Sequence, residues 1–97
     1  MPHYLTLIRW TPQGVAKIKE STSRLDTARQ AAGAFGGKLN DWYLLMGEYD
    51  GMFLSEFPDD ESLARFTLSV AAQGNVTTLT MKAFPEQDYR KIIASLP

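Results

Sequence analysis

The sequence contains no cysteine and only one histidine, which excludes several kinds of site. Without cysteine the chain has no disulfide, no thiolate metal ligand and no thiol nucleophile. The one histidine, His3, lacks a second nitrogen or sulfur ligand for a haem or transition-metal centre, and it lacks a partner for a catalytic triad. No glycine-rich phosphate-binding loop is present. We therefore expect no metal site and no cofactor.

The chain also lacks an excess of either charge and any long apolar run. Its 10 Lys and Arg nearly balance 11 Asp and Glu, giving a net charge of −1 and a pI of about 5.7. Nucleic-acid-binding domains usually carry a basic excess. No apolar segment approaches the length of a bilayer span, and the start of the chain, MPHYLTLIRW, has no basic leader. These features predict a cytoplasmic protein that binds neither nucleic acid nor membrane.

The apolar residues that are present suffice for the core of one domain. Hydrophobic residues make up 44% of the 97-residue chain, which is close to the commonest domain length. We expect a single domain over residues 1–97. β-branched, aromatic and leucine-rich runs predict strands over residues 4–10, 38–46, 51–57 and 75–84. Helical spacing and capping residues predict a helix from Thr11 to Phe35 with a break at residues 21–23, a helix after Pro58 that ends at Gly74, and a short terminal helix after Pro85.

The predicted order is therefore β-α-β-β-α-β with a C-terminal helix. This order is typical of the α+β ferredoxin-like fold, a four-stranded antiparallel sheet with two helices on one face. We expect the helices to face the sheet with apolar stripes that begin at Val15 and Ile18 in the first and at Leu63 and Phe66 in the second.

The strands carry large apolar residues at both odd and even positions, so the sheet face without helices should also be apolar. A large exposed apolar face normally marks an interaction surface. We assign Tyr4, Ile8 and Trp10 to this face and expect a second copy of the chain to cover it, giving a homodimer through the sheet faces.

Several segments resemble the GYD-domain family: YLTLIRWTPQG, GGKLNDWYLLMGEYD, FPDDE and GNVTTLTMKAF. The family is named after a Gly-x-Tyr-Asp turn, which Gly47, Tyr49 and Asp50 match, and the resemblance covers about residues 4–93. It implies a dimeric α+β barrel. It implies no reaction, because the family is uncharacterised and its superfamily includes cofactor-free monooxygenases, small isomerases, haem-dependent enzymes and ligand-sensing domains.

The turn itself allows two interpretations. Glu48 and Asp50 could form a carboxylate pair beside the Tyr49 hydroxyl, suited to acid–base chemistry or metal binding. Alternatively the turn is structural: Gly47 supplies a positive φ, the Asp50 side chain caps the turn and the Tyr49 ring packs nearby. We favour the structural role, which predicts that Gly47→Ala destabilises the protein by roughly 1 kcal/mol or more.

Two functions remain open from the sequence. The first is small-molecule binding inside the barrel, as in a cofactor-free monooxygenase-like or isomerase-like enzyme. Small-ligand pockets place a few polar groups in an apolar cavity, and the residues expected to do so here are Thr6, Tyr43, Thr78 and Thr80. The alternative is a non-catalytic dimeric module for ligand sensing or interaction. The sequence identifies no catalytic residue.

Overall fold

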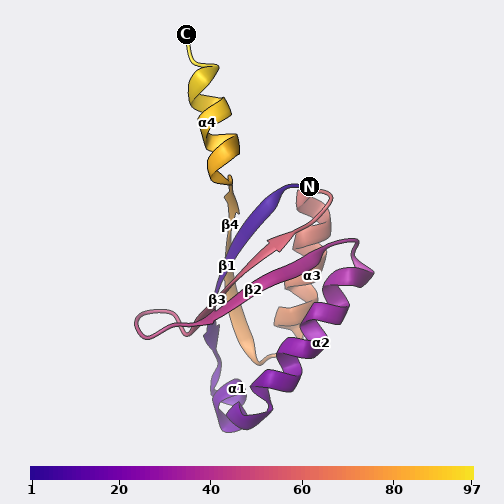
Figure 1. Ribbon diagram of the computed structural model, residues 1–97. Coiled ribbons are helices and arrows are strands. Elements are labelled where there is room, and N and C mark those ends of the chain that lie inside the picture. The colour runs from indigo at the N-terminus through magenta and orange to yellow at the C-terminus, as the bar shows by residue number, and fades with distance from the viewer.

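A four-stranded antiparallel sheet in the order β2-β3-β1-β4 organises the fold, as the computed structural model of residues 1–97 shows (Figure 1). The central strand β1 pairs with β3 on one side and with β4 on the other. The strands are β1 (His3–Trp10), β2 (Lys38–Leu44), β3 (Gly51–Glu56) and β4 (Val76–Ala83). This arrangement confirms the predicted ferredoxin-like fold.

Two helices, α2 (Ser21–Ala34) and α3 (Asp60–Ala72), lie on the same face of the sheet (Figure 1). A short helix, α1 (Pro12–Ala16), and a 3₁₀ turn (Ile18–Glu20) lead from β1 into α2. The terminal helix α4 (Glu86–Ala94) follows β4 and projects away from the body of the molecule (Figure 1). None of these helices has the length and apolar character needed to cross a membrane.

The helix boundaries follow local capping chemistry. The Thr11 hydroxyl accepts a hydrogen bond from the Gly14 N–H at 3.1 Å and caps α1, while an Asp59 carboxylate oxygen accepts one from the Ser62 N–H at 2.8 Å and caps α3. Beyond α2 and α3, Gly36 and Gly74 adopt φ values of 79° and 82°. Such values favour glycine, and both predicted helix ends are confirmed.

The break in the first helical segment lies earlier than predicted. Helical geometry is lost at Lys17, with φ −120° and ψ 40°, and α2 already begins at Ser21. The hydroxyls of Ser23 and Thr27 donate to backbone carbonyls three and four residues before them, so hydroxyl side chains are accommodated within this helix. Because the helical period is interrupted at Lys17, the start of the expected stripe is wrong: Val15 and Ile18 are exposed. The rest of that stripe is confirmed, since Ala32 is buried and Leu25, Ala28 and Phe35 pack against the core.

The core lies between the sheet and the two helices, with Phe66 of α3 at its centre. The Phe66 ring centroid lies 5.2 Å from that of Phe57, 6.1 Å from that of Phe53 and 6.5 Å from that of Phe35. Aromatic pairs at such separations stabilise a core beyond their buried area. The buried apolar cluster comprises Tyr4, Ala32, Leu39, Phe53, Phe57, Leu63 and Phe66.

The faces of β1 are the reverse of those predicted. Tyr4 and Ile8 are buried on the helix-covered face, and Trp10 lies on that face as well. The Tyr4 hydroxyl donates to an Asp60 carboxylate oxygen at 2.5 Å, and burial together with this hydrogen bond raises the pKa of Tyr4 to about 12. Strand residues alternate between faces, so Leu5 and Leu7 lie on the open face instead.

Substitutions at two glycines, Gly33 and Gly37, test how closely the chain packs around the end of α2 and the start of β2. A Cβ atom at Gly37 would lie 2.3 Å from Cδ1 of Phe57 and 2.5 Å from the carbonyl oxygen of Glu56, whereas a Cβ at Gly33 would meet nothing within 4 Å. We expect Gly37→Ala to lower the free energy of unfolding by about 1–3 kcal/mol, because backbone must shift. Gly33→Ala should leave it unchanged or raise it by up to about 1 kcal/mol through helix propensity. Urea unfolding of both variants measures the difference, and equal stabilities would contradict this account of Gly37.

Candidate functional site

The open face of the sheet carries an apolar patch built from cross-strand neighbours. In the register of the sheet, Leu5 lies between Leu54 and Met81, and Leu7 lies between Met52 and Leu79. No helix covers these side chains, and Leu79 and Met81 are 47% and 44% exposed. We call the set of Leu5, Leu7, Met52, Leu54, Leu79 and Met81 the apolar patch. Such a patch usually marks an interaction surface.

Charged groups lie at one end of the patch, around Glu56 of β3. Its carboxylate oxygens lie 3.4 Å from Nε2 of His3 and 3.5 Å from Nζ of Lys38, and one accepts a hydrogen bond from the Asn40 amide at 3.0 Å. The Asn40 hydrogen bond and the neighbouring Lys38 charge hold the pKa of Glu56 below its usual value. An apolar centre with a polar border is the usual layout of a protein interface.

The Gly-x-Tyr-Asp loop, residues 45–50, joins β2 to β3 and is fastened to the end of β1 by Asp50. The Asp50 N–H donates to the Ile8 carbonyl at 2.9 Å, and the Asp50 carboxylate accepts from the Trp10 N–H at 2.9 Å. The Leu45 N–H donates to the Asp50 carbonyl, also at 2.9 Å, which closes the loop. These contacts favour the structural interpretation of the turn.

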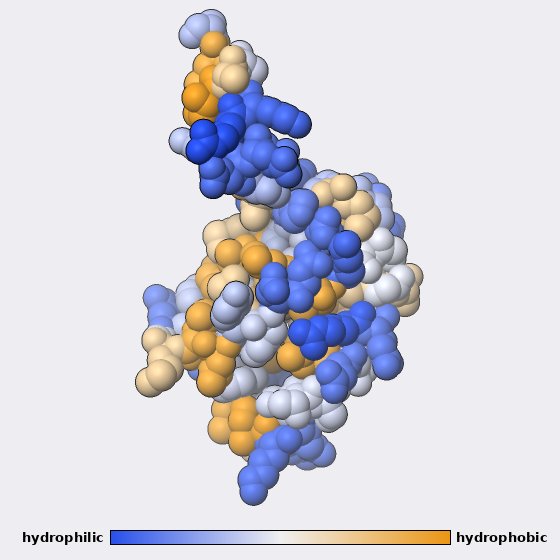
Figure 2. Space-filling view, in the orientation of Figure 1, coloured by the Kyte–Doolittle hydropathy of each residue, from blue (hydrophilic) through white to orange (hydrophobic).

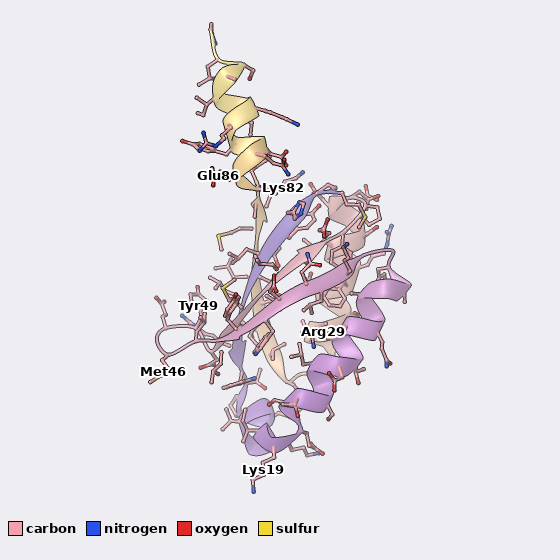
Figure 3. The ribbon with its side chains drawn as sticks, in the orientation of Figure 1. Lys19, Arg29, Met46, Tyr49, Lys82 and Glu86 are labelled. Atoms are coloured by element: carbon pink, nitrogen blue, oxygen red, sulfur yellow. The ribbon has the colours of Figure 1, made fainter.

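The rest of the loop packs on Arg9. The guanidinium carbon of Arg9 lies 4.5 Å from the centroid of the Tyr49 ring, a cation–π geometry. Arg9 also donates to the Glu48 carboxylate at 2.8 Å and to the Glu48 carbonyl at 3.0 Å. Glu48 is thus bound to Arg9, and Asp50 to the backbone of β1, so the two carboxylates serve different partners. Figure 3 shows Met46 at the outer end of the loop and Tyr49 nearer the strands.

Gly47 does not have the backbone conformation that we expected. Gly36 and Gly74 are the glycines with positive φ, and Gly47 is not among them. A Cβ atom added to Gly47 would meet nothing within 4 Å. The loop is held by the side chain and backbone of Asp50 and does not depend on a left-handed glycine, so the expectation of strain at Gly47 was wrong.

The residues expected to bind a ligand lie on both sides of the sheet. The hydroxyls of Thr6 and Thr80 hydrogen-bond each other at 2.9 Å on the helix-covered side, where Thr6 is fully buried. Thr78 lies on the same side and lines a cleft. Tyr43 lies across the sheet on the open face and is 56% exposed. The sheet therefore separates Tyr43 from the threonines, and the four do not converge in one cavity.

A cleft of about 340 Å³ opens between α2 and α3, over the sheet. Its volume lies at the lower end of the range for small-molecule pockets. The sequence analysis did not identify this cleft; the available signal was the pair of small residues, Ala28 and Ala31, on the inner side of α2. Its main apolar lining consists of Ile8, Trp10, Leu25, Ala28, Ala31, Leu39, Trp42, Leu44, Phe53, Phe66, Val70 and Val76.

The acidic residues and His3 nowhere gather into a metal-binding arrangement: no group of three or more His, Cys, Asp or Glu side chains could hold an ion. The polar groups around the patch are instead engaged in ion pairs and hydrogen bonds with one another. The features that remain for function are therefore the apolar patch, the cleft and the projecting helix α4.

The order of the elements and the four-stranded antiparallel sheet define a ferredoxin-like α+β domain, and solved structures agree on this fold. FFRP-DM1 aligns with a TM-score of 0.62 and 17% identity, covering 87% of this chain and all of that one (100%). At3g17210 from Arabidopsis thaliana aligns with a TM-score of 0.64 and 12% identity, and the alignment covers 88% of this chain and 95% of that one. At these identities the likeness concerns the fold alone. The GYD domain matches residues 4–93, and the chain belongs to the GYD domain family.

One relative within reach of sequence comparison has a descriptive name. A protein of Thermus thermophilus called "Glutamine synthetase and cystathionine beta-lyase binding protein" is 29% identical over 89 residues. The match covers 91% of this chain and 94% of that protein, so the two align over nearly their full lengths. The name describes a protein that binds two enzymes.

The contacts of Asp50 predict which residue of the family turn matters for stability. Asp50→Ala leaves the Trp10 N–H without its partner, and we expect a loss of about 1–2 kcal/mol in the free energy of unfolding. Gly47→Ala, in open space and at ordinary φ, should change it by no more than about 0.5 kcal/mol. Thermal unfolding of Asp50→Ala and Gly47→Ala measures these losses. Asp50→Asn, which retains a hydrogen-bond acceptor, serves as the control. A larger loss for Gly47→Ala than for Asp50→Ala would refute the assignment.

Proposed function

We propose that this protein is a non-catalytic homodimeric interaction module whose two copies pack sheet against sheet through the apolar patch. The observation that carries the proposal is the patch itself. Its side chains belong to three neighbouring strands and form two cross-strand rows, Leu54–Leu5–Met81 and Met52–Leu7–Leu79. Since α2 and α3 occupy the opposite face, no helix covers these rows: Leu79 and Met81 are exposed, and the other four side chains are half-buried by their neighbours.

The size and layout of the open face suit a stable association. Standard interfaces bury about 800 Å² per partner, and apolar area contributes about 25 cal/mol per Å² before the cost of association is subtracted. The ion pairs of Glu56 at one end of the patch and of Arg9 at the other would remain at the border, where charged groups need not lose their hydration. The dimeric type of the structural neighbours supports the same arrangement.

The projecting helix α4 provides a second surface, which we assign to partner proteins. Its apolar side is formed by Tyr89, Ile92 and Ile93, and Leu96 follows just after the helix; all four are between 43% and 61% exposed. Hydrophobic residues accordingly gather on one side of α4, above the body of the molecule (Figure 2). Amphipathic helices of this kind bind in apolar grooves of other proteins. The name of the Thermus thermophilus relative makes glutamine synthetase and cystathionine beta-lyase the first partners to test.

A cofactor-free enzyme of the monooxygenase or isomerase type has less support. Such an enzyme needs polar groups that converge and are free to act on a substrate. The hydroxyls of Thr6 and Thr80 are committed to each other, and Tyr43 lies on the other side of the sheet. The relative is moreover named for binding proteins and not for a reaction.

The dimer is tested by placing a charge in the centre of the apolar patch. We expect light scattering at micromolar concentration to give twice the 10.9 kDa chain mass for the wild type and the monomer mass for Leu7→Glu. The carboxylate would have to be buried without a partner in the interface. Leu68→Glu is the matched control, since Leu68 lies on α3 and is already 69% exposed. A wild-type monomer, or a dimer unchanged by Leu7→Glu, would overturn the proposal.

The role of α4 is tested separately by binding to immobilised glutamine synthetase and cystathionine beta-lyase. We expect the wild type to bind at least one of them, Ile92→Glu to weaken binding at least tenfold, and Gln87→Glu on the polar side of α4 to bind as the wild type does. The loss corresponds to the removal of one buried apolar contact. Absence of wild-type binding to both enzymes would reject these partners, while the dimer measurement would stand by itself.

A further inference from the structure

The cleft between α2 and α3 lies on the side of the sheet opposite the apolar patch, so it is a separate surface from the proposed dimer interface. Leu25, Ala28 and Ala31 of α2 line one wall, and Phe66 and Val70 of α3 line the other. The floor is the helix-covered face of the sheet. Because alanine side chains are short, α2 leaves space where leucines at the same positions would fill it. The result is an apolar cleft with defined walls.

Two tryptophans give the cleft flat aromatic surfaces. Trp10 and Trp42 both line it, and both are only half-buried. The Trp42 ring packs directly against Gly51 on the neighbouring strand: a Cβ atom at Gly51 would lie 2.3 Å from Cη2 of the ring. The six-membered ring therefore occupies the space that a side chain of β3 would otherwise take. A ring packed in this way loses less conformational freedom when it contacts a planar ligand than a fully solvated ring would.

Arg24 is the one charged residue among those that line the cleft, and no carboxylate joins it. Its guanidinium donates to the carbonyls of Lys17 at 3.0 Å and Gly14 at 3.3 Å, which fixes the position of the charge. A guanidinium has five N–H donors, so these two contacts leave donors for an anion. An apolar cleft with a single fixed positive charge favours a ligand that is apolar over most of its surface and anionic at one end.

We propose that this cleft binds a small aromatic carboxylate, with the aromatic ring against Trp10 and Trp42 and the carboxylate at Arg24. The volume of about 340 Å³ admits a molecule with one or two rings. Thr78 also lines the cleft and brings a neutral hydroxyl to it. A cationic ligand would find no counter-charge here.

The protein contains two tryptophans and both line the cleft, so its intrinsic fluorescence reports directly on occupancy. The probes are 3-phenylpropionate and its uncharged amide, titrated with excitation at a wavelength that the phenyl ring does not absorb. We expect a saturable change with the acid and binding of the amide that is about tenfold weaker, the difference expected for one charge-assisted hydrogen bond. Arg24→Gln should reduce binding of the acid to the level of the amide and leave the amide unaffected.

A variant that fills the cleft tests whether the ligand binds there. Ala28→Phe should abolish the fluorescence response, whereas Ala64→Phe, on the exposed side of α3, should preserve it. Circular dichroism confirms that both variants fold, and if Ala28→Phe does not fold, the Arg24→Gln comparison decides alone. The response should also persist in Leu7→Glu, which separates the cleft from the dimer. No saturation at millimolar acid, equal binding of acid and amide, or an undiminished response in folded Ala28→Phe would overturn the proposal.

Discussion

The structure depends on one constraint: the sheet is apolar on both faces, but the helices cover only one of them. The helices α2 and α3 bury one face around Phe66. The other face keeps Leu5 and Leu7 on β1 with their neighbours on β3 and β4 in contact with water. Burying apolar area is the main favourable term in folding and in association. The same sequence feature thus stabilises the core and leaves a surface suited to a second chain.

The order of the elements could be predicted because it depends on local chemistry. Pro12 after Thr11, the acidic residues after Pro58, and glycines after the helices act within a few residues of their own positions. The faces of β1 could not be predicted in this way. Both sets of alternating residues contain large apolar side chains, so the alternation does not say which set the helices cover. Which set lies under the helices depends on the path of the whole chain.

The candidate site likewise combines features that local sequence predicts with features that depend on the whole fold. The family turn is visible in the sequence, but its support comes from Asp50 reaching the backbone of Trp10, and the distance between those positions along the chain hides the contact. The cleft was missed for a related reason. A cavity is space that side chains leave unfilled, so it depends on Ala28 and Ala31 meeting the particular shapes of residues on other elements. No spacing rule in one segment describes that fit.

The strand β1 belongs to both surfaces at once. Ile8 and Trp10 face the cleft, Leu7 faces the open side, and a single peptide bond joins Leu7 to Ile8. A displacement of β1 caused by an occupant on one side must therefore move side chains on the other. If cleft occupancy shifts the strand, the free energies of the two associations become linked, and each changes the other's affinity by the same factor. In that case β1, which contributes side chains to both faces, would be the element that couples them.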